Sequence, residues 1–344
     1  MRAPAGLHLD YVSLAEYQAA RWADVLGVAT FNGTPDAAAG VAEIPIAQVR
    51  TPVLPGSEHV YEVWRCGRPA ASGQRERVRF RRTADMLFGC IAVSEAQFAA
   101  PTHSALHQAT TQAYREICAT LDAENYPHLL RVWNYLPDIN RDSHGTERYR
   151  QFNSARQHAL HEYGRSLKGN VPAASALGAT SDSPLVVYFL AGRTAPTFVE
   201  NPRQVSAYHY PLQYGTHSPV FSRATLLRQP GGGLALFISG TASIVGHRSL
   251  HIGDTAAQTR ETLTNIEALL AEANRVAGGA HFELGALACK VYVRRPADLP
   301  VIKAQLAPAV GAGATVIYLQ ADICRQDLLV EIEATGLSSL RADA

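Results

Sequence analysis

Apolar and polar residues form a repeated series of strand and helix patterns in the second half of the chain. Between two apolar runs, Thr259, Leu263, Ile266 and Leu270 recur near one face, which predicts an amphipathic helix over 255–273. A second helix is predicted after Pro296. Short apolar runs predict strands over 234–243, 286–295, 314–323 and 328–334. The predicted order is therefore β-α-β-α-β-β.

The first half shows the same order more weakly. Helices are predicted over 103–123 and 145–164, and strands over 86–93, 128–140, 174–180 and 183–192. We interpret this self-similarity as a duplication. It predicts an N-terminal domain over residues 1–170, a C-terminal domain over residues 171–344, and an active site between them. Residues 1–80 add further strands, such as 24–31 and 60–66, and a polar linker over 68–79.

The last predicted strand carries two carboxylates. Leu328, Val330 and Ile332 point to one side of this strand, and Leu329, Glu331 and Glu333 point to the other. On this stretch alone, a solvent-facing edge strand explains the pattern. A Glu that faces a closed pocket is the alternative, and the rest of the chain decides between the two.

Composition and charge exclude several classes of function. The 344 residues are 47% hydrophobic and 18% charged, with a formal net charge of +1, so nothing favours a nucleic acid or an anionic membrane as partner. No apolar run is long enough to span a bilayer, and the N-terminus has no signal-peptide pattern. The five cysteines form no C-x-x-C pair, which predicts a reduced cytoplasmic protein without a disulfide framework. No metal-binding or cofactor-binding motif is present, so we expect neither a metal nor a cofactor.

Residues 234–336 resemble the YjgF/Rid superfamily through four motifs in register: "ISGTAS", "GDTAAQTRETLTNIEALLAEA", "CKVYVRRPADL" and "DLLVEIEATG". The resemblance implies an α+β fold with two YjgF/Rid-like (chorismate-mutase-like) domains, each a mixed β-sheet with helices packed on one face. A narrower resemblance, to the chorismatases, covers about residues 130–336. It is carried by "WNYLPDIN", "YRQFNSAR", "YHYPLQYG", "PVFSRAT", "GHRSLHIGD" and "DICRQDLLVEIE".

The narrower resemblance implies an enzyme that releases pyruvate from chorismate. Rid deaminases carry an Arg just before the penultimate strand, but this chain has "GAGATV" over 311–316. Protonation of the enolpyruvyl methylene carbon requires a positioned acid, and a carboxylic acid can serve near neutral pH only if burial raises its pKa. The resemblance assigns this role to Glu331. Glu333, two residues on, is expected at the strand end, either solvated or structural.

Other site residues are predicted by residue chemistry and by the matching motifs. Two substrate carboxylates need cations, and we favour Arg156 and Arg223, with Arg150 and Arg294 as further candidates. Arg150 and Arg156 lie six residues apart on one predicted helix, so we expect only one of them to reach a given pocket. Tyr210 and Tyr214 either line the substrate ring or pack between the domains.

Two further residues bear on the product. In the resembling family, a hydrolytic branch carries Ala at the positions of Gly240 and Cys324, whereas the branch that forms 3-hydroxybenzoate carries Gly and Cys, as here. The resemblance therefore implies that Gly240 enlarges the pocket and that Cys324 acts as a weak donor or proton shuttle. It also implies an intramolecular reaction that yields 3-hydroxybenzoate. Some relatives also form 4-hydroxybenzoate, and the sequence leaves both products open.

Two other functions stay open at this stage: a Rid-type imine or enamine deaminase, and a non-catalytic small-molecule-binding module on the same fold. The expected partner is a small-molecule substrate, chorismate in the leading hypothesis. Rid domains commonly form trimers, and a duplicated chain can satisfy part of that surface internally. The chain is therefore predicted to be a monomer or a homotrimer.

Overall fold

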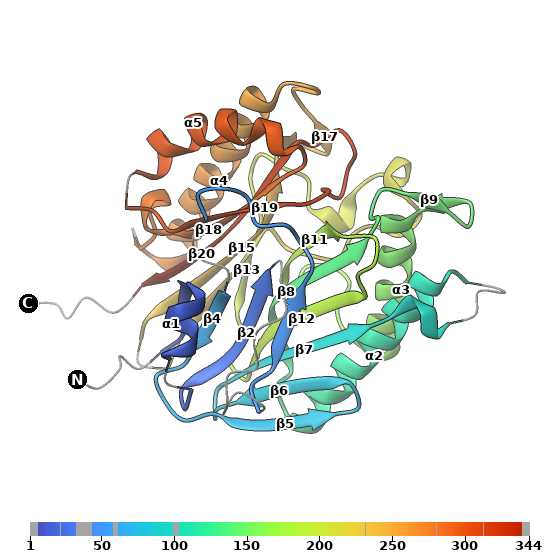
Figure 1. Cartoon of the computed structure of the whole chain (residues 1–344), viewed down its shortest axis with the longest axis vertical. Coiled ribbons are helices and arrows are strands. Elements are labelled where there is room, and N and C mark those ends of the chain that lie inside the picture. Colours follow the sequence, from blue (N-terminus) through green and yellow to red (C-terminus); the bar gives the residue numbers. More distant parts are fainter. Residues whose placement is uncertain are drawn as a thin grey trace, which may run out of the picture.

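The computed structural model describes residues 6–20, 22–31, 43–57, 61–98, 103–230, 232–279, 281–311 and 313–338. Within these ranges the chain forms three main β-sheets, of four, six and six strands, and the longer helices lie on the outer faces of the two larger sheets (Figure 1). We call them the N-terminal, middle and C-terminal sheets. No helix in the described ranges has both the length and the apolar character needed to cross a membrane.

The N-terminal sheet contains the strands of the first 65 residues. Its strands are β1 (His8–Val12), β2 (Val25–Phe31), β3 (Ile46–Val49) and β4 (Tyr61–Arg65), in the order β1-β4-β2-β3. The short helix α1 (Leu14–Gln18) begins at Ser13, which forms a capping box with Glu16. The sheet lies against the faces of the other two sheets that their helices leave uncovered (Figure 1).

The middle sheet has the order β11-β8-β12-β7-β6-β5 and is covered on one face by α2 (Ala105–Glu124) and α3 (Arg148–Glu162). Ser104 caps the start of α2, and Asn125 ends it in the left-handed conformation. The small hairpin of β9 (Asp142–Ser143) and β10 (Thr146–Glu147) precedes α3. The six strands of the sheet are β5 (Ala71–Arg75), β6 (Val78–Arg82), β7 (Met86–Val93), β8 (His128–Pro137), β11 (Ala173–Ala179) and β12 (Leu185–Gly192).

The C-terminal sheet has the order β13-β14-β15-β20-β18-β19 and is covered by α4 (Thr255–Ala277) and α5 (Leu299–Val310). Asp254 caps α4, and Gly278 ends it with a positive φ of 86°. The small hairpin of β16 (Ile244–Val245) and β17 (Arg248–Ser249) follows β15. The six strands of the sheet are β13 (Thr197–Val199), β14 (Ala224–Arg228), β15 (Leu234–Ala242), β18 (Ala288–Val293), β19 (Val316–Gln320) and β20 (Val330–Ser338).

The two large sheets repeat one topology, which confirms the predicted fold class. The strand orders of the two sheets correspond place by place: β5-β6-β7-β12-β8-β11 in the middle sheet and β13-β14-β15-β20-β18-β19 in the C-terminal sheet. In both units one pair is parallel, β11 with β8 and β18 with β19. In both, the last strand is inserted antiparallel between two earlier ones.

The prediction of a polar linker over 68–79 is wrong. These residues form β5 and the start of β6, a hairpin that corresponds to β13 and β14. Most residues of β5 are exposed, which explains why their polar side chains resemble a linker. The change from one large sheet to the other comes between Gly192 and Thr197.

The two large sheets meet along β11, and this contact positions the site. The backbone amides of Ala173 and Ala174 donate to the side chains of Thr225 (2.9 Å) and Ser239 (2.9 Å). The Gly240 amide donates to Ser175 Oγ at 3.0 Å. Because hydrogen bonds cross the junction, the end of β15 is held at a fixed distance from the middle sheet.

Candidate active site

A cavity opens where β15 and β20 of the C-terminal sheet approach the start of α3 and the loop over 206–219. It contains seven of the nine residues predicted from the sequence: Glu331, Cys324, Gly240, Arg223, Tyr210, Tyr214 and Arg150. Seven other residues line it as well: Glu147, Tyr149, Pro219, Phe221, Ala242, Ile244 and Arg325. We call this space the Glu331 cavity. Within the described ranges no cluster of three His, Cys, Asp or Glu side chains has metal-binding geometry.

Glu331 is a buried carboxylic acid at the wall of this cavity. It lies in β20, opposite Tyr292 of β18, with its side chain 3% exposed. Val330 and Ile332 point to the other face of the sheet and pack in the core beneath α4 and α5, as the alternation predicted. Burial, and secondarily the nearby Glu333 carboxylate, raises the pKa of Glu331 to about 8. At neutral pH the side chain is therefore mostly protonated.

Glu333 is buried and fully paired, so of the two predicted alternatives, solvated or structural, the structural one holds, and the residue lies within β20 and not at its end. Its carboxylate accepts hydrogen bonds from Arg131 Nη2 (2.8 Å), Trp133 Nε1 (2.7 Å) and Ser175 Oγ (2.6 Å), and Lys290 Nζ lies 2.7 Å away. Burial alone would raise the pKa of Glu333, but the Lys290 and Arg131 cations hold it below its usual range. Two adjacent glutamates thus take opposite protonation states.

Lys290 extends the ion pairs of Glu333 to the N-terminal sheet. Its ammonium lies 2.6 Å from Glu62 Oε2 in β4 and donates to the Tyr188 hydroxyl at 2.8 Å. Trp64 Nε1 donates to the other Glu62 oxygen at 2.7 Å. Two carboxylates and two cations therefore balance one another at the junction of the three sheets: Glu62 and Glu333, and Lys290 and Arg131. We call these four residues the buried charge cluster.

Gly240 lies in a β-bulge of β15 directly beside the Glu331 carboxyl. The register between β15 and β20 shifts between Ile238 and Thr241, where β15 holds one extra residue. A Cβ at Gly240 would lie 1.9 Å from Glu331 Oε1 and 2.7 Å from its Cδ. The space that a side chain would fill is therefore occupied by the acid itself, which refines the expectation that glycine simply enlarges the pocket.

Arg223 is a buried cation on the cavity wall without a carboxylate partner. It is 3% exposed, and its Nη2 donates to the Val205 carbonyl (2.8 Å) and the Tyr210 hydroxyl (2.7 Å). Its Nε has no hydrogen-bond partner, and no salt bridge reaches it within the described residues. The Glu200 carboxylate is near enough for Arg223 to oppose the rise in pKa that burial causes there, but no ion pair joins the two side chains, so the unpartnered Nε of Arg223 stays available to an anionic ligand.

Arg325 is a cavity cation that the sequence reasoning missed. It lies over the Tyr214 ring, 4.0 Å from the centroid, and donates Nη1 to the His247 carbonyl at 2.9 Å, while its Nη2 has no partner. Tyr214 is held in turn by a 2.6 Å hydrogen bond to the same carbonyl. Arg325 stands within the quoted motif "DICRQD", directly after Cys324, so the motif carried the signal that could have identified it.

Arg150 and Cys324 also line this cavity. Arg150 is 43% exposed and donates to the Gln213 carbonyl at 3.1 Å, which places it at the rim. Cys324 is half-buried beside Glu331, and burial, then the Glu331 charge, raises the pKa of its thiol to about 12. Cys324 is thus a neutral thiol that can donate a weak hydrogen bond.

Two predicted residues lie outside the Glu331 cavity. Arg294 does not line it, because its guanidinium is fixed by the carbonyls of Leu328 (2.7 Å), Ile323 (3.0 Å) and Arg325 (2.9 Å). It therefore holds the loop between β19 and β20 rather than a ligand. Arg156 lines a different cavity farther along α3. Arg150 and Arg156 thus face separate cavities, which agrees with their six-residue spacing.

Comparison with known proteins gives consistent matches over most of the chain. Residues 62–191 match the family described as "Chorismatase FkbO/Hyg5-like, N-terminal". A 3-hydroxybenzoate synthase of Streptomyces hygroscopicus is 37% identical over 289 residues, which are 82% of this chain and 82% of that protein. A chorismatase of Streptomyces rapamycinicus is 38% identical, over 80% of this chain and 82% of that protein. The crystal structure of a chorismatase superposes with a TM-score of 0.86 at 33% identity, over 96% of this chain and 98% of that one.

Proposed function

This chain belongs to the chorismatase family, and from that premise we propose that it converts chorismate to 3-hydroxybenzoate and pyruvate. The observation that carries the proposal is the geometry around Glu331. A protonated carboxylic acid faces a cavity whose wall also holds two arginines with unpaired nitrogens. An acid and free cations in one space match a substrate that carries both an enol ether and two carboxylates.

Glu331 is proposed as the general acid. Carbon protonation is slow, so the donor must stay protonated at working pH and must lie beside the carbon. Burial meets the first need, since it raises the pKa of Glu331 to about 8. The bulge at Gly240 meets the second, because it leaves room for the carboxyl to reach into the cavity.

Arg223 and Arg325 are proposed to bind the two substrate carboxylates. Both arginines are fixed by protein acceptors through one nitrogen and keep another without a partner, Nε in Arg223 and Nη2 in Arg325. A fixed guanidinium loses little freedom when it binds a carboxylate, and a bond to a charged group contributes about 1.5–3 kcal/mol. Arg150 at the rim is placed to attract the dianion before it enters.

The bond changes balance without water. Glu331 gives its proton to the methylene carbon of the enolpyruvyl group, the ether bond to the ring breaks, and pyruvate leaves. The neighbouring ring hydroxyl oxygen bonds to the carbon that the ether left, and its proton restores the Glu331 carboxyl. The resulting arene-oxide-like intermediate opens at the other carbon–oxygen bond, and a proton passes from the ring to the oxygen, which gives 3-hydroxybenzoate. The walls from Phe221, Ala242 and Ile244 are apolar and keep competing water from the ring.

The test is to incubate the purified chain with chorismate and to follow pyruvate with lactate dehydrogenase. Pyruvate should form in a 1:1 ratio with an aromatic product that chromatography identifies as 3-hydroxybenzoate. Glu331→Gln should abolish both, whereas Glu267→Gln, on the outer part of α4, should abolish neither. Absence of pyruvate from the unmodified chain would refute the proposal. A mainly 4-hydroxybenzoate or dihydroxycyclohexadiene product would refute the assigned product while keeping the substrate.

A further inference from the structure

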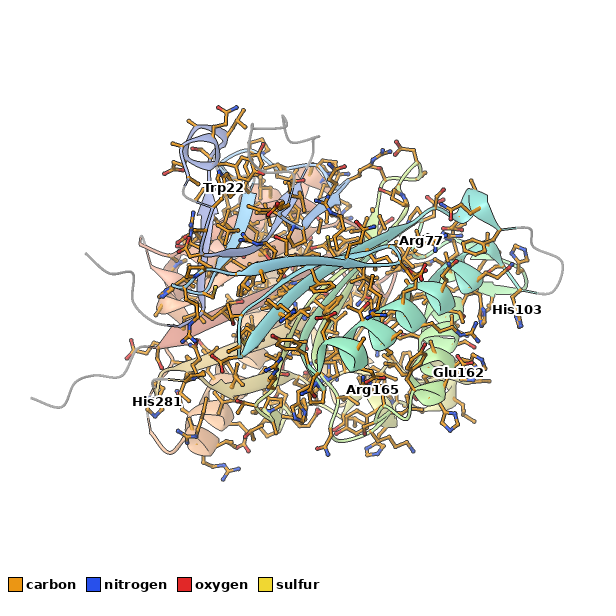
Figure 2. All side chains as sticks on the ribbon, turned by 90° about the horizontal axis from the view of Figure 1, so that it is seen from below. Trp22, Arg77, His103, Glu162, Arg165 and His281 are labelled. Atoms are coloured by element: carbon orange, nitrogen blue, oxygen red, sulfur yellow. The ribbon has the colours of Figure 1, made fainter. Side chains whose placement is uncertain are left out.

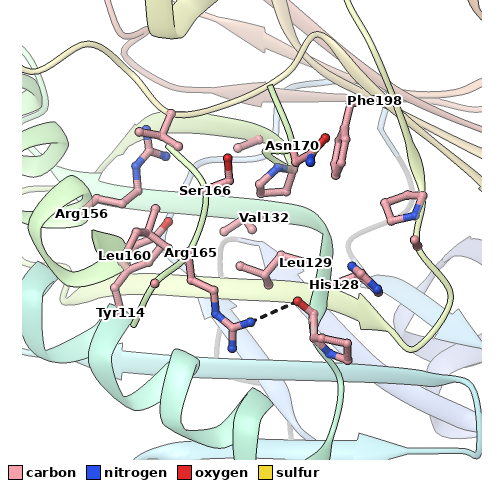
Figure 3. Close-up of a pocket in the computed structure, with 17 residues that line it drawn as sticks. Tyr114, His128, Leu129, Val132, Arg156, Leu160, Arg165, Ser166, Asn170 and Phe198 are labelled. Atoms are coloured by element: carbon pink, nitrogen blue, oxygen red, sulfur yellow. Dashed lines mark hydrogen bonds between the residues drawn. The ribbon is translucent and has the colours of Figure 1, made fainter. Parts of the chain in front are cut away.

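A second cavity, of about 320 Å³, lies along the C-terminal half of α3 (Figure 3). It is lined by the starts of β8 and β11 and by the chain segment that follows α3. The Glu331 cavity is lined instead by the start of α3, so the two cavities share this helix but share no lining residue. A volume near 300 Å³ is the lower end of the usual range for small-molecule sites.

Arg156 is a buried cation on the wall of this second cavity. Its side chain is 3% exposed, its Nη2 donates to Asn153 Oδ1 at 3.1 Å, and its guanidinium lies 4.9 Å from the centre of the Phe152 ring. The Tyr114 hydroxyl is also near. Its Nε has no hydrogen-bond partner, and it forms no salt bridge with any carboxylate in the described part of the chain.

The other deeply buried arginines show why this is unusual. Arg131 is paired with Glu333, and Arg148 is paired with Glu95. Arg81 donates to the carbonyls of Trp22, Val25, Ala23 and Ala70. Among these five arginines, only Arg156 and Arg223 have neither an ion pair with a carboxylate nor hydrogen bonds to several carbonyls in the described part of the chain, although Glu200 lies near Arg223. Because Arg223 faces the proposed substrate, the parallel indicates a second anion site at Arg156.

The remaining charge in the cavity has the same sign. Arg165 also lines it and is held by an ion pair with Asp122 and by the Pro127 carbonyl at 3.2 Å, while its Nε has no partner. Figure 2 shows Arg165 near the end of α2 that carries Asp122, opposite the end marked by His103. Among the described residues no Asp or Glu lines the cavity, so the field inside it favours an anion.

Apolar side chains form much of the rest of the wall. Figure 3 shows Arg156 and Tyr114 on one side of the cavity and Phe198 on the opposite side. Leu129 and Val132 lie between them, and Leu160 lies on the side of Arg156 and Tyr114. A cation at one end and an apolar chamber beyond it suit a ligand with one carboxylate and one planar ring.

We propose that this cavity is a second ligand site, which binds a single-ring aromatic monocarboxylate with its carboxylate on Arg156 and its ring between Leu160 and Phe198. The site itself does not depend on the proposed reaction. Only the identity of the natural ligand rests on that reaction, because its product belongs to this chemical class. Occupancy would be transmitted through α3, whose first turn carries Tyr149 and Arg150 in the Glu331 cavity.

The test measures binding of radiolabelled benzoate to the full chain by equilibrium dialysis. Arg223→Met together with Arg325→Met removes the two arginines assigned to the substrate carboxylates in the Glu331 cavity, and this double variant should still bind one benzoate per chain. Adding Arg156→Met should weaken that binding at least tenfold, whereas adding Arg275→Met, at a surface arginine on α4, should leave it unchanged. Ala195→Trp places a bulky side chain on the exposed rim of the second cavity, so it should block binding even if Arg156→Met fails to fold.

Two outcomes would overturn the second site. If the Arg223→Met/Arg325→Met variant binds no benzoate, benzoate occupies only the Glu331 cavity. If Ala195→Trp binds benzoate as the unmodified chain does, the second cavity is not the site. Chorismate cleavage by Ala195→Trp, measured in the pyruvate assay, separates this result from the proposed function, because the rim variant should keep the basal rate.

Discussion

Replacing Gly240 by Ala should test whether catalysis needs the Glu331 carboxyl at its observed position, and not only its presence in the cavity. The new Cβ would lie 1.9 Å from Glu331 Oε1, whereas ordinary van der Waals contact begins near 3.4 Å. The carboxyl must therefore move by about 1.5 Å, since the Cβ is fixed to a backbone that donates to Ser175. A misplacement of about 1 Å can cost roughly 100-fold in rate. We expect the rate of 3-hydroxybenzoate formation to fall about 100-fold, with little change in KM because Arg223 and Arg325 are untouched.

The assay follows 3-hydroxybenzoate by chromatography and pyruvate by enzyme coupling under saturating chorismate. Gly313→Ala is the matched control, because a Cβ at that position meets nothing within 4 Å. The shorter acid in Glu331→Asp makes room for the new methyl group, so it should cost far less in the Gly240→Ala background than in the native one. A Gly240→Ala variant that keeps its 3-hydroxybenzoate rate within threefold, or additive effects of the two substitutions, would refute this account of the bulge.

Three further predictions concern charge. The kcat/KM for chorismate should be level below pH 8 and should fall about tenfold per pH unit above it, because Glu331 ionises. Glu333→Gln removes the neighbouring negative charge, so it should move this decline to lower pH. A decline at the same pH in Glu333→Gln would contradict the coupling between the two glutamates. Glu331→Gln should leave the free energy of unfolding unchanged at pH 4 but raise it at pH 8, by at most about 5 kcal/mol in urea unfolding. The reason is that the folded chain keeps a proton on Glu331 that the unfolded chain loses near the usual pKa of Glu. Equal stability of the variant and the unmodified chain at pH 8 would show that burial does not perturb this acid. Arg223→Met and Arg325→Met should each raise KM roughly 10–100-fold, whereas the surface variant Arg275→Met should not; an unchanged KM in both cavity variants would remove the assigned carboxylate contacts.

Periodicity was sufficient to predict the repeated units. The helix over 255–273 is observed as Thr255–Ala277, and the strand over 86–93 as Met86–Val93. Helix faces and strand alternation are local properties, so they are visible in one sequence. In the missed hairpin, β5 is largely exposed and polar, so it has no apolar pattern to detect. Its partner β6 is mostly buried, but three of its five residues are arginines, which resemble a linker in the sequence.

The candidate site was predicted less completely, because its geometry depends on contacts between distant segments. Glu331 and Glu333 have the same sequence environment, yet one is protonated and the other is ionised. Lys290 and Arg131 cause that difference, and they come from strands 40 or more residues away. Arg156 and Arg223 were predicted together as substrate ligands, but only the packing of α3 shows that they face different cavities. The contact between Gly240 and the Glu331 carboxyl requires a bulge that no residue pattern marks.

The buried charge cluster also constrains how the chain can reach its native state. Its four residues come from all three sheets, and each is almost completely removed from water: Glu62, Arg131, Lys290 and Glu333. A half-assembled intermediate would bury some of these charges before their counterions arrive, at a cost of several kcal/mol per ion. Docking of the three sheets should therefore be a single cooperative event. A fragment that contains the C-terminal sheet alone should leave Lys290 and Glu333 accessible to solvent. The Glu331 acid beside them would then not be held rigidly.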